Sequence, residues 1–308
     1  MIDCVLALDL GGTNSRFGAV LADGEIVARR REKTPEGTSG DALADFLVEH
    51  LRFVAAEVAA DAKILAVAAA IPAIFDAETG LPARLPNLAQ LEGVDLSKIL
   101  NDAFGVRAVL ENDATAATIG EHWLGASKGS NHVIGVTLGT GVGGGLIIEG
   151  KPFRGRDGNA GEIGHICVEP DGVRCGCGSR GCVEQYSSGT AIVREAIDAG
   201  LSVKNAKEVY DLAISGDEKA RRVFESAGRY LGIALSGLVN VLNPEAIVLG
   251  GGVAASWDFL IEPVRREIAS RCYEATARRV KICRAHLGED AGILGAARVA
   301  FLADHPAE

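Results

Sequence analysis

The chain has 308 residues, more than one hydrophobic core usually serves, so we expect two lobes with a cleft between them. Its composition, 48% apolar and 23% charged, is typical of a globular α/β protein and excludes disordered and fibrous classes. The formal net charge of -10 leaves no basic face to displace counterions from a polyanion, so we expect no nucleic-acid partner.

The N-terminal segment, MIDCVLALDLGG, predicts a buried strand that ends in a tight turn at Gly11 and Gly12. Asp3 and Asp9 interrupt this apolar run, which lacks the charged start and long apolar core of a signal peptide. No later apolar run reaches the length of a membrane-spanning helix. We therefore expect a cytoplasmic protein without a membrane partner, whose seven cysteines are reduced thiols or metal ligands.

Strands and helices alternate through the first third of the chain. The Asp23-Gly24 pair indicates a β-hairpin, and apolar residues recur at helical spacing over residues 41–60. Two further buried strands, ILAVAAAI and VRAVLEN, follow, and the second leads into Asp113 and the helical stretch ATAATIGEHW. This alternation predicts a largely parallel sheet.

The opening pattern of strand, glycine turn and strand returns near residue 130. VIGVTLGTGVGGGLIIEGK aligns with VLALDLGGTNSRFGAVLADGE at a constant offset, which matches Leu10 with Leu138 and Gly11 with Gly139. Two glycine-rich hairpins can resemble each other by chance. An internal duplication, however, fits the two lobes expected from the length.

The last third of the chain is predicted to be mainly helical. Helices are expected from about Ser188, Ala206 and Asp217, and Asp217 is a suitable N-cap for the third. EAIVLGGGVA then repeats the sequence of strand and glycines, and VKICRAHLGEDAGILGAARVAFL closes the chain with a strand and a helix.

Three glycine-rich turns follow predicted buried strands. Glycines lack Cβ, so the backbone N–H groups of such turns can approach phosphate oxygens closely. No turn contains a P-loop motif, and a strand rather than a helix follows the second turn, which argues against a dinucleotide fingerprint. The third turn lies at a strand-to-helix junction, where a helix N-terminus favours anions. Each could be only a tight turn, but all three together predict phosphate binding by Gly11, Gly12, Thr13, Asn14, Gly139, Thr140, Gly141, Gly250, Gly251 and Gly252.

One histidine and three cysteines lie close together in GHICVEPDGVRCGCGSRGCVEQY. His165, Cys175, Cys177 and Cys182 would form the closed tetrahedral set that structural zinc prefers, with no open position for a reacting water. Cys167 is close enough to His165 to compete as the fourth ligand. Reduced thiols without a metal are the alternative.

These motifs resemble the ROK family of sugar kinases and repressors, within the actin-like and hexokinase-like ATPase fold. The resemblance covers essentially the whole chain. Its most specific parts are GNAGEIGH at 158–165 and CGCGSRGCVE at 175–184, and the opening DLGGTN and the END at 111–113 are also typical. It implies an α/β, two-lobed, duplicated ribonuclease H-like architecture with an interlobe cleft.

We expect the chain to be divided into two lobes. The small N-terminal lobe would comprise residues 1–114 and 295–308. The large C-terminal lobe, which carries the zinc motif, would comprise residues 115–294.

Asp113 is the candidate catalytic base. A sugar hydroxyl is a weak nucleophile, so a carboxylate that accepts its proton would promote phosphoryl transfer. Asp113 lies between a predicted strand and a predicted helix, on the side of an open sheet where ligands collect, although the same position suits a helix N-cap. The resemblance implies the catalytic role.

The resemblance also implies the other roles by position. Asp9 matches a residue that helps to organise Mg²⁺ and phosphate, and the turns at 11–13 and 139–141 match the phosphate loops. His165 is favoured over Cys167 as the fourth ligand of a structural Zn²⁺. ATP with Mg²⁺ and a hexose are the implied substrates, and a homodimer the implied assembly. Further sugar contacts are implied at Asn87, Asn112, Glu162, His165 and Glu184.

We therefore expect an ATP-dependent hexose kinase, with glucose as the first choice and its 6-hydroxyl as the acceptor. N-acetylmannosamine, N-acetylglucosamine, allose and fructose stay open as substrates, and polyphosphate as donor. A non-catalytic sugar-binding regulator is the rival from another class. A repressor is disfavoured because the first strand begins within a few residues of Met1, which leaves no room for a helix-turn-helix domain.

Overall fold

The computed structural model describes residues 2–59, 62–85 and 87–304. Contacts between residues divide the chain into two compact units, and the chain passes from one unit to the other four times. The first unit comprises Met1–Lys128, Pro152–Ala160 and Glu289–Glu308, and the second comprises Gly129–Lys151 and Gly161–Gly288. Neither unit is therefore a single continuous segment.

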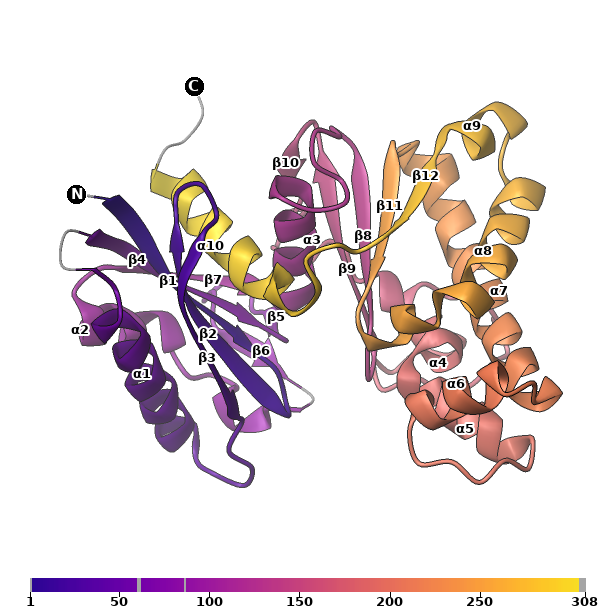
Figure 1. The fold of residues 1–308 in the computed structure, drawn as a ribbon, viewed down its shortest axis with the longest axis horizontal. Coiled ribbons are helices and arrows are strands. Elements are labelled where there is room, and N and C mark those ends of the chain that lie inside the picture. The colour runs from indigo at the N-terminus through magenta and orange to yellow at the C-terminus, as the bar shows by residue number, and fades with distance from the viewer. Residues whose placement is uncertain (1, 60–61, 86, 305–308) are drawn as a thin grey trace. The chain divides into compact units, whose positions relative to one another are not determined.

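A five-stranded sheet with the order β3-β2-β1-β4-β7 forms the centre of the first unit (Figure 1). β1, β2 and β3 are antiparallel neighbours, as the Asp23-Gly24 pair predicted, and β4 and β7 run parallel to β1. A second, two-stranded sheet pairs β5 with β6. The strands are β1 (Ile2–Leu10), β2 (Asn14–Leu21), β3 (Ile26–Lys33), β4 (Ala62–Ile71), β5 (Ile74–Phe75), β6 (Pro82–Arg84) and β7 (Arg107–Asn112).

Helices cover both faces of this sheet. Leu6 and Leu8 of β1 pack in one hydrophobic cluster with Leu43 and Leu47 of α1, because alternate residues of a strand face the same side. α10 covers the opposite face, where its residue Gly292 lies against Asp9 (Figure 1). The helices of this unit are α1 (Gly40–Ala56), α2 (Leu96–Phe104), α3 (Asp113–Trp123), α10 (Ala291–Asp304) and the short 3₁₀ helices η1 (Ala89–Leu91) and η4 (Gly288–Asp290), the last at the boundary of the unit.

The sheet of the second unit repeats the topology of the first, with the order β10-β9-β8-β11-β12. β8 and β9 are antiparallel, and β11 and β12 run parallel to β8. The repeated strand, glycine turn and strand of the sequence therefore occupy equivalent places in two similar sheets. The strands are β8 (Val133–Leu138), β9 (Val142–Ile148), β10 (Lys151–Pro152), β11 (Ala246–Gly250) and β12 (Lys281–Arg284).

The helices of the second unit begin where the sequence predicted them. Ser188, Asn205 and Asp217 are N-caps, and each side chain accepts a hydrogen bond from a backbone N–H of the first helical turn. The helices are α4 (Glu184–Ser187), α5 (Gly189–Asp198), α6 (Ala206–Ile214), α7 (Glu218–Leu242), α8 (Trp257–Arg271), α9 (Glu274–Arg279) and the 3₁₀ helices η2 (Ile163–His165) and η3 (Gly252–Ser256).

The compact units and the predicted lobes are divided at different residues. α3, which was assigned to the second lobe from residue 115, belongs to the first unit because it packs closely on α10. Glycines allow this approach: Gly120 lies against the carbonyl of Ala291, and Gly295 against that of Ala116. Residues 152–160 also belong to the first unit, which no sequence pattern indicated.

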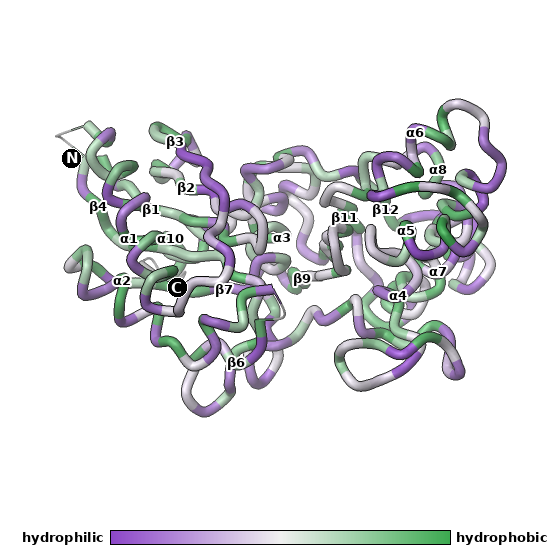
Figure 2. The backbone as a smooth tube through the Cα atoms, turned by 90° about the horizontal axis from the view of Figure 1, so that it is seen from below, coloured by the Kyte–Doolittle hydropathy of each residue, from purple (hydrophilic) through white to green (hydrophobic). Residues whose placement is uncertain are grey.

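β3 is the polar edge strand of the first sheet. Figure 2 shows it as a hydrophilic segment, in contrast to the apolar β1 at the centre of the sheet. Arg29 and Arg31 on β3 form ion pairs with Asp290 and Glu289, which precede α10. Charged edges discourage pairing with further strands. None of the described helices combines the length and apolar character that crossing a bilayer requires.

Candidate active site

The carboxyl ends of three parallel strands bring predicted site residues to one edge of the first sheet. Asp9 on β1 pairs in register with Ala70 on β4, and Ala70 pairs with Glu111 on β7. Asp9 and Glu111 are thus two strand spacings apart, about 10 Å, and Asp113 follows two residues later. Ligands of open α/β sheets collect at this edge.

Asp113 is the first residue of α3, but it is not the N-cap. Asn112 takes that position, because its Oδ1 accepts the Thr115 N–H at 3.0 Å, while its Nδ2 donates to the Ala73 carbonyl at 3.4 Å. Asp113 Oδ1 accepts the N–H of Ala114 at 2.8 Å. The alternative interpretation of Asp113 as an N-cap is therefore wrong, and the predicted sugar contact Asn112 has a structural role in this cap.

The Asp9 carboxylate lies between Arg16 and the first turn of α10. Arg16 Nη1 is 3.4 Å from Asp9 Oδ2, and Arg16 Nη2 donates to Glu289 Oε1 at 3.0 Å. A Cβ added to Gly292 would approach Asp9 Cγ to 2.6 Å, so α10 leaves no space on that side. Burial raises the pKa of Asp9 above its ordinary value, although the positive charge of Arg16 partly offsets this rise.

The first glycine turn is a tight connection between β1 and β2. Gly11 N–H donates to the Asn14 carbonyl at 3.0 Å, and Thr13 is exposed at the tip. A Cβ on Gly12 would come within 2.9 Å of Asn87 Cβ, so only glycine allows these segments to meet. The structure thus places Asn87, a predicted sugar contact, directly beside the predicted phosphate turn.

Glu111, two residues before Asp113, forms an ion pair with Arg154 that no sequence pattern indicated. Arg154 donates to Glu111 Oε2 from Nε at 2.9 Å and from Nη2 at 2.6 Å. Glu111 Oε1 accepts the N–H of Asn112 at 3.1 Å.

Asn159 anchors the segment that contains Arg154, because the Asn159 side chain both accepts from Phe75 N and donates to Phe75 O at 3.2 Å. The END motif at 111–113 indicated this region, but no role was predicted for its glutamate, Glu111.

The second glycine turn is held by the start of α5. Gly139 N–H donates to the Gly141 carbonyl at 2.9 Å, and the Gly139 carbonyl accepts the Gly189 N–H at 2.7 Å. The Thr190 hydroxyl donates to the Thr140 carbonyl at 2.8 Å. The sequence Ser188-Gly189-Thr190 at the start of a predicted helix was a signal for this contact.

The third turn begins at the end of β11. Gly251 has a φ of +84°, and any Cβ there would collide with the Leu138 carbonyl at the end of β8. The α-helix expected directly after these glycines is replaced by the 3₁₀ helix η3, and α8 begins only at Trp257. Gly252 opens η3, whereas Gly250 is the last residue of β11.

A pocket of about 910 Å³ lies beside the second and third turns, within the volume range of small-molecule sites. Gly139, Thr140 and Gly252 line one part of it. Val193 and Tyr210 belong to its apolar walls, which come from α5 and α6. The sequences of α5 and α6 show only an amphipathic pattern, which does not reveal these walls. Lysines also line the pocket, at positions 204 and 207.

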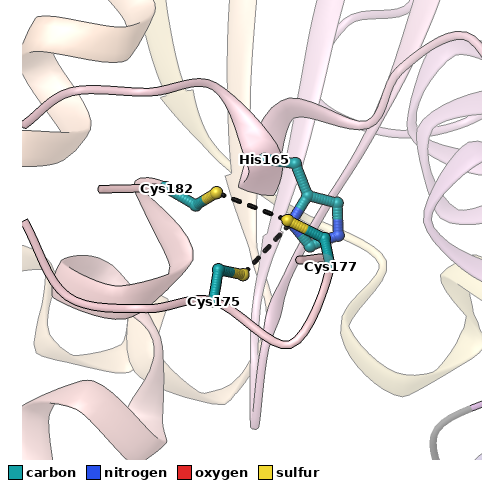
Figure 3. Close-up of side chains that lie close together, drawn as sticks. All are labelled: His165, Cys175, Cys177 and Cys182. Atoms are coloured by element: carbon teal, nitrogen blue, oxygen red, sulfur yellow. Dashed lines mark hydrogen bonds between the residues drawn. The ribbon is translucent and has the colours of Figure 1, made fainter. Parts of the chain in front are cut away.

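The predicted zinc ligands converge in the second unit, where their four ligand atoms all lie within 4.8 Å of one another (Figure 3). His165 Nδ1 is 3.7 Å from Cys175 Sγ, and the sulfurs of Cys177 and Cys182 are 3.6 Å apart. Tetrahedral zinc with Zn–S bonds of about 2.3 Å separates its ligand atoms by about 3.7 Å, so this donor set fits zinc. Exposed Cys167 forms a backbone bridge with Cys182 and is not a member of the set.

Neighbouring side chains orient this cluster. Gln185 Nε2 donates to Cys175 Sγ at 3.7 Å, and Arg194 Nη1 donates to Gln185 Oε1 at 3.2 Å. The Tyr186 hydroxyl accepts the Val173 N–H at 3.0 Å and so fixes the loop between the ligands. Such outer contacts set the direction of metal ligands.

The predicted sugar ligands of the second unit surround the zinc motif. His165 Nε2 is 3.7 Å from Glu162 Oε2. Glu184 Oε2 accepts the N–H of Val142 at 3.1 Å, so Glu184 connects the zinc motif to the second glycine turn. Burial raises the pKa of Glu162; His165 partly offsets the rise and Glu184 adds to it.

A family model for the ROK family matches residues 5–302 of the chain. The chain belongs to the ROK family. It is 34% identical to the glucokinase of Thermotoga maritima over 96% of both chains. It is 35% identical to the N-acetylmannosamine kinase of Yersinia pestis over 95% of this chain and 96% of that protein.

Solved ROK structures share the fold. The crystal structure of a ROK glucokinase from Streptomyces griseus, in complex with glucose and AMPPNP, aligns with a TM-score of 0.81. The two chains are 33% identical over 97% of this ROK protein and 99% of that chain. The expected family and the mixed α/β fold with two sheets are thereby confirmed.

Proposed function

We propose that this ROK protein is an ATP-dependent hexose kinase that transfers the γ-phosphoryl group to the 6-hydroxyl of glucose. The observation that carries the proposal is the position of Asp113 at the carboxyl end of β7. The chain in which it occurs is similar to glucokinases along nearly its whole length.

Asp113 would act as the general base. In the reaction the sugar O6 forms a bond to the γ-phosphorus, the bond from that phosphorus to the β–γ bridging oxygen breaks, and ADP leaves. The hydroxyl proton goes to the Asp113 carboxylate. Because Asn112 caps α3, the backbone at Asp113 is fixed independently of its own carboxylate.

The pocket beside the second and third glycine turns supports a nucleotide as donor. Val193 and Tyr210 offer apolar contact to a nucleoside, a part that polyphosphate lacks, while the turns at Gly139 and Gly252 offer backbone donors to phosphate. The oxygens of Asp9 suit a hard cation, and bound Mg²⁺ would neutralise negative charge on the triphosphate.

The zinc motif would have a structural role. His165 and the three cysteines are four ligands, so the metal would hold the loop from residue 165 to residue 182 without taking part in chemistry. Glu162, His165 and Glu184 stay proposed sugar contacts, because carboxylates accept hydrogen bonds from hydroxyls.

N-acetylmannosamine is the second candidate acceptor. The chain is 35% identical to an N-acetylmannosamine kinase and 34% identical to a glucokinase, so these identities do not distinguish the two acceptors. A sugar panel decides between them. Purified zinc-loaded protein would be assayed with glucose, N-acetylmannosamine, N-acetylglucosamine, allose and fructose, each with ATP and with polyphosphate, and the sugar phosphate quantified.

We expect the highest kcat/KM for glucose with ATP. Preference for N-acetylmannosamine would change the substrate but not the reaction class. Sugar binding by calorimetry without any phosphoryl transfer would instead support the non-catalytic regulator. The proposal also includes a cytoplasmic location and a homodimer, and light scattering of the purified protein tests the latter.

A further inference from the structure

Thr34, which directly follows β3, donates hydrogen bonds to the backbone of the first glycine turn. Thr34 is 5% exposed, and its hydroxyl donates to the Gly11 carbonyl at 2.6 Å. Its backbone N–H donates to the Thr13 carbonyl at 3.0 Å. Thr34 follows Thr13 by 21 residues and Gly11 by 23 residues, yet it fixes the carbonyl groups of both.

A second buried hydroxyl supports the first. Ser15 is 0% exposed, and its Oγ lies 2.9 Å from Thr34 Oγ1. A threonine hydroxyl has one hydrogen, and that of Thr34 goes to the Gly11 carbonyl, so Ser15 donates to Thr34. The direction of both hydrogen bonds is thereby determined: Ser15 donates to Thr34, and Thr34 donates to Gly11. Buried hydroxyls without partners are costly, which holds this arrangement in place.

The orientation of the Gly11–Gly12 peptide follows from this contact. A trans peptide is planar, and its N–H points opposite to its C=O. Because Thr34 binds the Gly11 carbonyl, the Gly12 N–H points away from Thr34. Gly12 is partly exposed, and its N–H has no acceptor within the described part of the chain.

Because Gly11 and Gly12 are consecutive glycines, the peptide between them needs a contact that fixes its orientation. Without Cβ atoms, the peptide between Gly11 and Gly12 can rotate to present either its carbonyl or its N–H to the same side. A carbonyl in that position would repel a phosphate. The Thr34 hydroxyl, as a donor, selects the orientation that presents the N–H.

The second glycine turn uses the same arrangement. The Thr140 carbonyl accepts the Thr190 hydroxyl, and the Gly139 carbonyl accepts the Gly189 N–H. In both turns, therefore, donors from another segment bind the carbonyls and leave the opposite N–H groups available. In the first turn the side-chain donor is Thr34, which is buried.

We propose that Thr34 is a positioning residue for phosphoryl transfer: it fixes the Gly11–Gly12 peptide so that the Gly12 N–H donates to a phosphate oxygen of the nucleotide. The inference rests on the proposed kinase function and specifies how the first glycine turn serves it. Thr34 itself does not touch the substrate.

The test compares variants that differ in one hydroxyl. Thr34→Val keeps the shape of the side chain but removes the donor, and Thr34→Ser keeps the donor. We expect Thr34→Val to lower kcat/KM for ATP by about ten- to a hundredfold, as weakened phosphate donors do, with KM for the sugar unchanged. Thr34→Ser should restore activity to near that of the wild type.

Ser15→Ala is the matched control. It removes an equally buried hydroxyl but leaves the bond from Thr34 to Gly11, so its effect on kcat/KM should be smaller than that of Thr34→Val. The thermal transition of each variant shows whether it is folded, and Thr34→Ala replaces Thr34→Val if the valine variant does not fold.

Calorimetry with Mg²⁺ and AMPPNP separates this inference from the kinase proposal. We expect weaker AMPPNP binding by the valine variant than by the wild type and the serine variant. Equal affinity and equal kcat/KM in all three, or a serine variant as impaired as the valine variant, would overturn the inference. A wild-type protein that phosphorylates no sugar refutes the kinase proposal, and the AMPPNP comparison still decides the role of Thr34. Failure of the wild type to bind AMPPNP would overturn both.

Discussion

Two adjacent residues at the start of α3 divide the structural and the proposed chemical work. Asn112 caps the helix through its side chain, while Asp113 occupies the first helical position. A substitution at Asp113 can therefore remove the proposed base without removing the cap. The two functions can be tested separately for this reason.

Asp113→Asn should lower kcat by about 10²–10⁴-fold, because an amide cannot accept the hydroxyl proton. Sugar binding measured by calorimetry should largely persist, and the thermal transition should move little. Asn112→Ala is the contrasting variant, with an expected loss of about 1 kcal/mol of stability from the missing cap. Near-normal turnover of Asp113→Asn would remove Asp113 as the base.

Cys4 provides a pH-dependent prediction in the core of the first unit. Burial raises the pKa of this thiol from its ordinary value of 9.0 to about 11. Between these two values the folded protein keeps a proton that the unfolded chain loses, so stability falls as pH rises from 9 towards 11. Below pH 9 this contribution is constant.

The Cys4→Ala variant should lack this slope. It should be less stable than the wild type at pH 8, because Cys4 is 0% exposed and its sulfur fills the core. The difference in thermal stability between the two proteins should narrow from pH 9 to pH 11, by at most about tenfold in the unfolding constant per pH unit. Parallel pH profiles of the two proteins would contradict the prediction.

At the scale of elements, the segment 152–160 is bound to β7, the strand that directly precedes the catalytic candidate Asp113. Arg154 binds the buried Glu111, and Glu111 in turn accepts the Asn112 N–H. The segment therefore supports the β7–α3 connection as well as its own conformation. GNAGEIGH begins within this segment, at residue 158.

Arg154→Ala should destabilise the protein by about 2 kcal/mol, because it leaves a buried carboxylate without its charged partner. It should also lower kcat, since the backbone before Asp113 loses a support. Arg156→Ala is the control in the same segment, because the Arg156 side chain is 95% exposed. A similar loss in both variants would indicate that the segment, and not the ion pair, is responsible.

Local patterns predicted the elements well, and long-range contacts escaped them. Strand ends, glycine turns and N-caps depend on neighbouring residues, and the four zinc ligands lie within an 18-residue segment. Thr34 and Arg154 act on residues far away in the chain, and nothing in their own sequence neighbourhood indicates those partners. The boundary of the first unit depends on the packing of α10 against α3, for the same reason.

Adjacent residues of similar chemistry were a further source of error. Asn112 and Asp113 are both good N-caps, and only the start of the backbone helix decides between them. The pocket walls on α5 and α6 escaped prediction because an amphipathic pattern identifies the buried face but not the cavity beside a helix.

At the scale of the whole molecule, each unit carries one of the two tryptophans. Trp123 lies in α3 of the first unit, and Trp257 lies in α8 of the second unit, which also contains the zinc motif. Each tryptophan therefore reports on one unit. Trp123→Phe and Trp257→Phe give two proteins with a single reporter each.

Removal of the metal by a chelator should lower the thermal transition reported by Trp257 more than the one reported by Trp123. The reason is that a zinc ion bound by the four proposed ligands would stabilise a loop of the second unit, because metal binding contributes directly to folding. Metal content measured by mass spectrometry accompanies each melt. Equal shifts at both reporters, or no shift in protein shown to be metal-free, would contradict a local structural role.

The order of segments along the chain has a consequence for synthesis. The first unit includes β1 at one end of the chain and α10 near the other. α10 covers the face of the sheet that carries Asp9, and it is translated long after the five strands of that sheet. Many proteins fold their N-terminal part during translation. Here one apolar face of the N-terminal sheet stays uncovered until α10, Ala291–Asp304, has been translated.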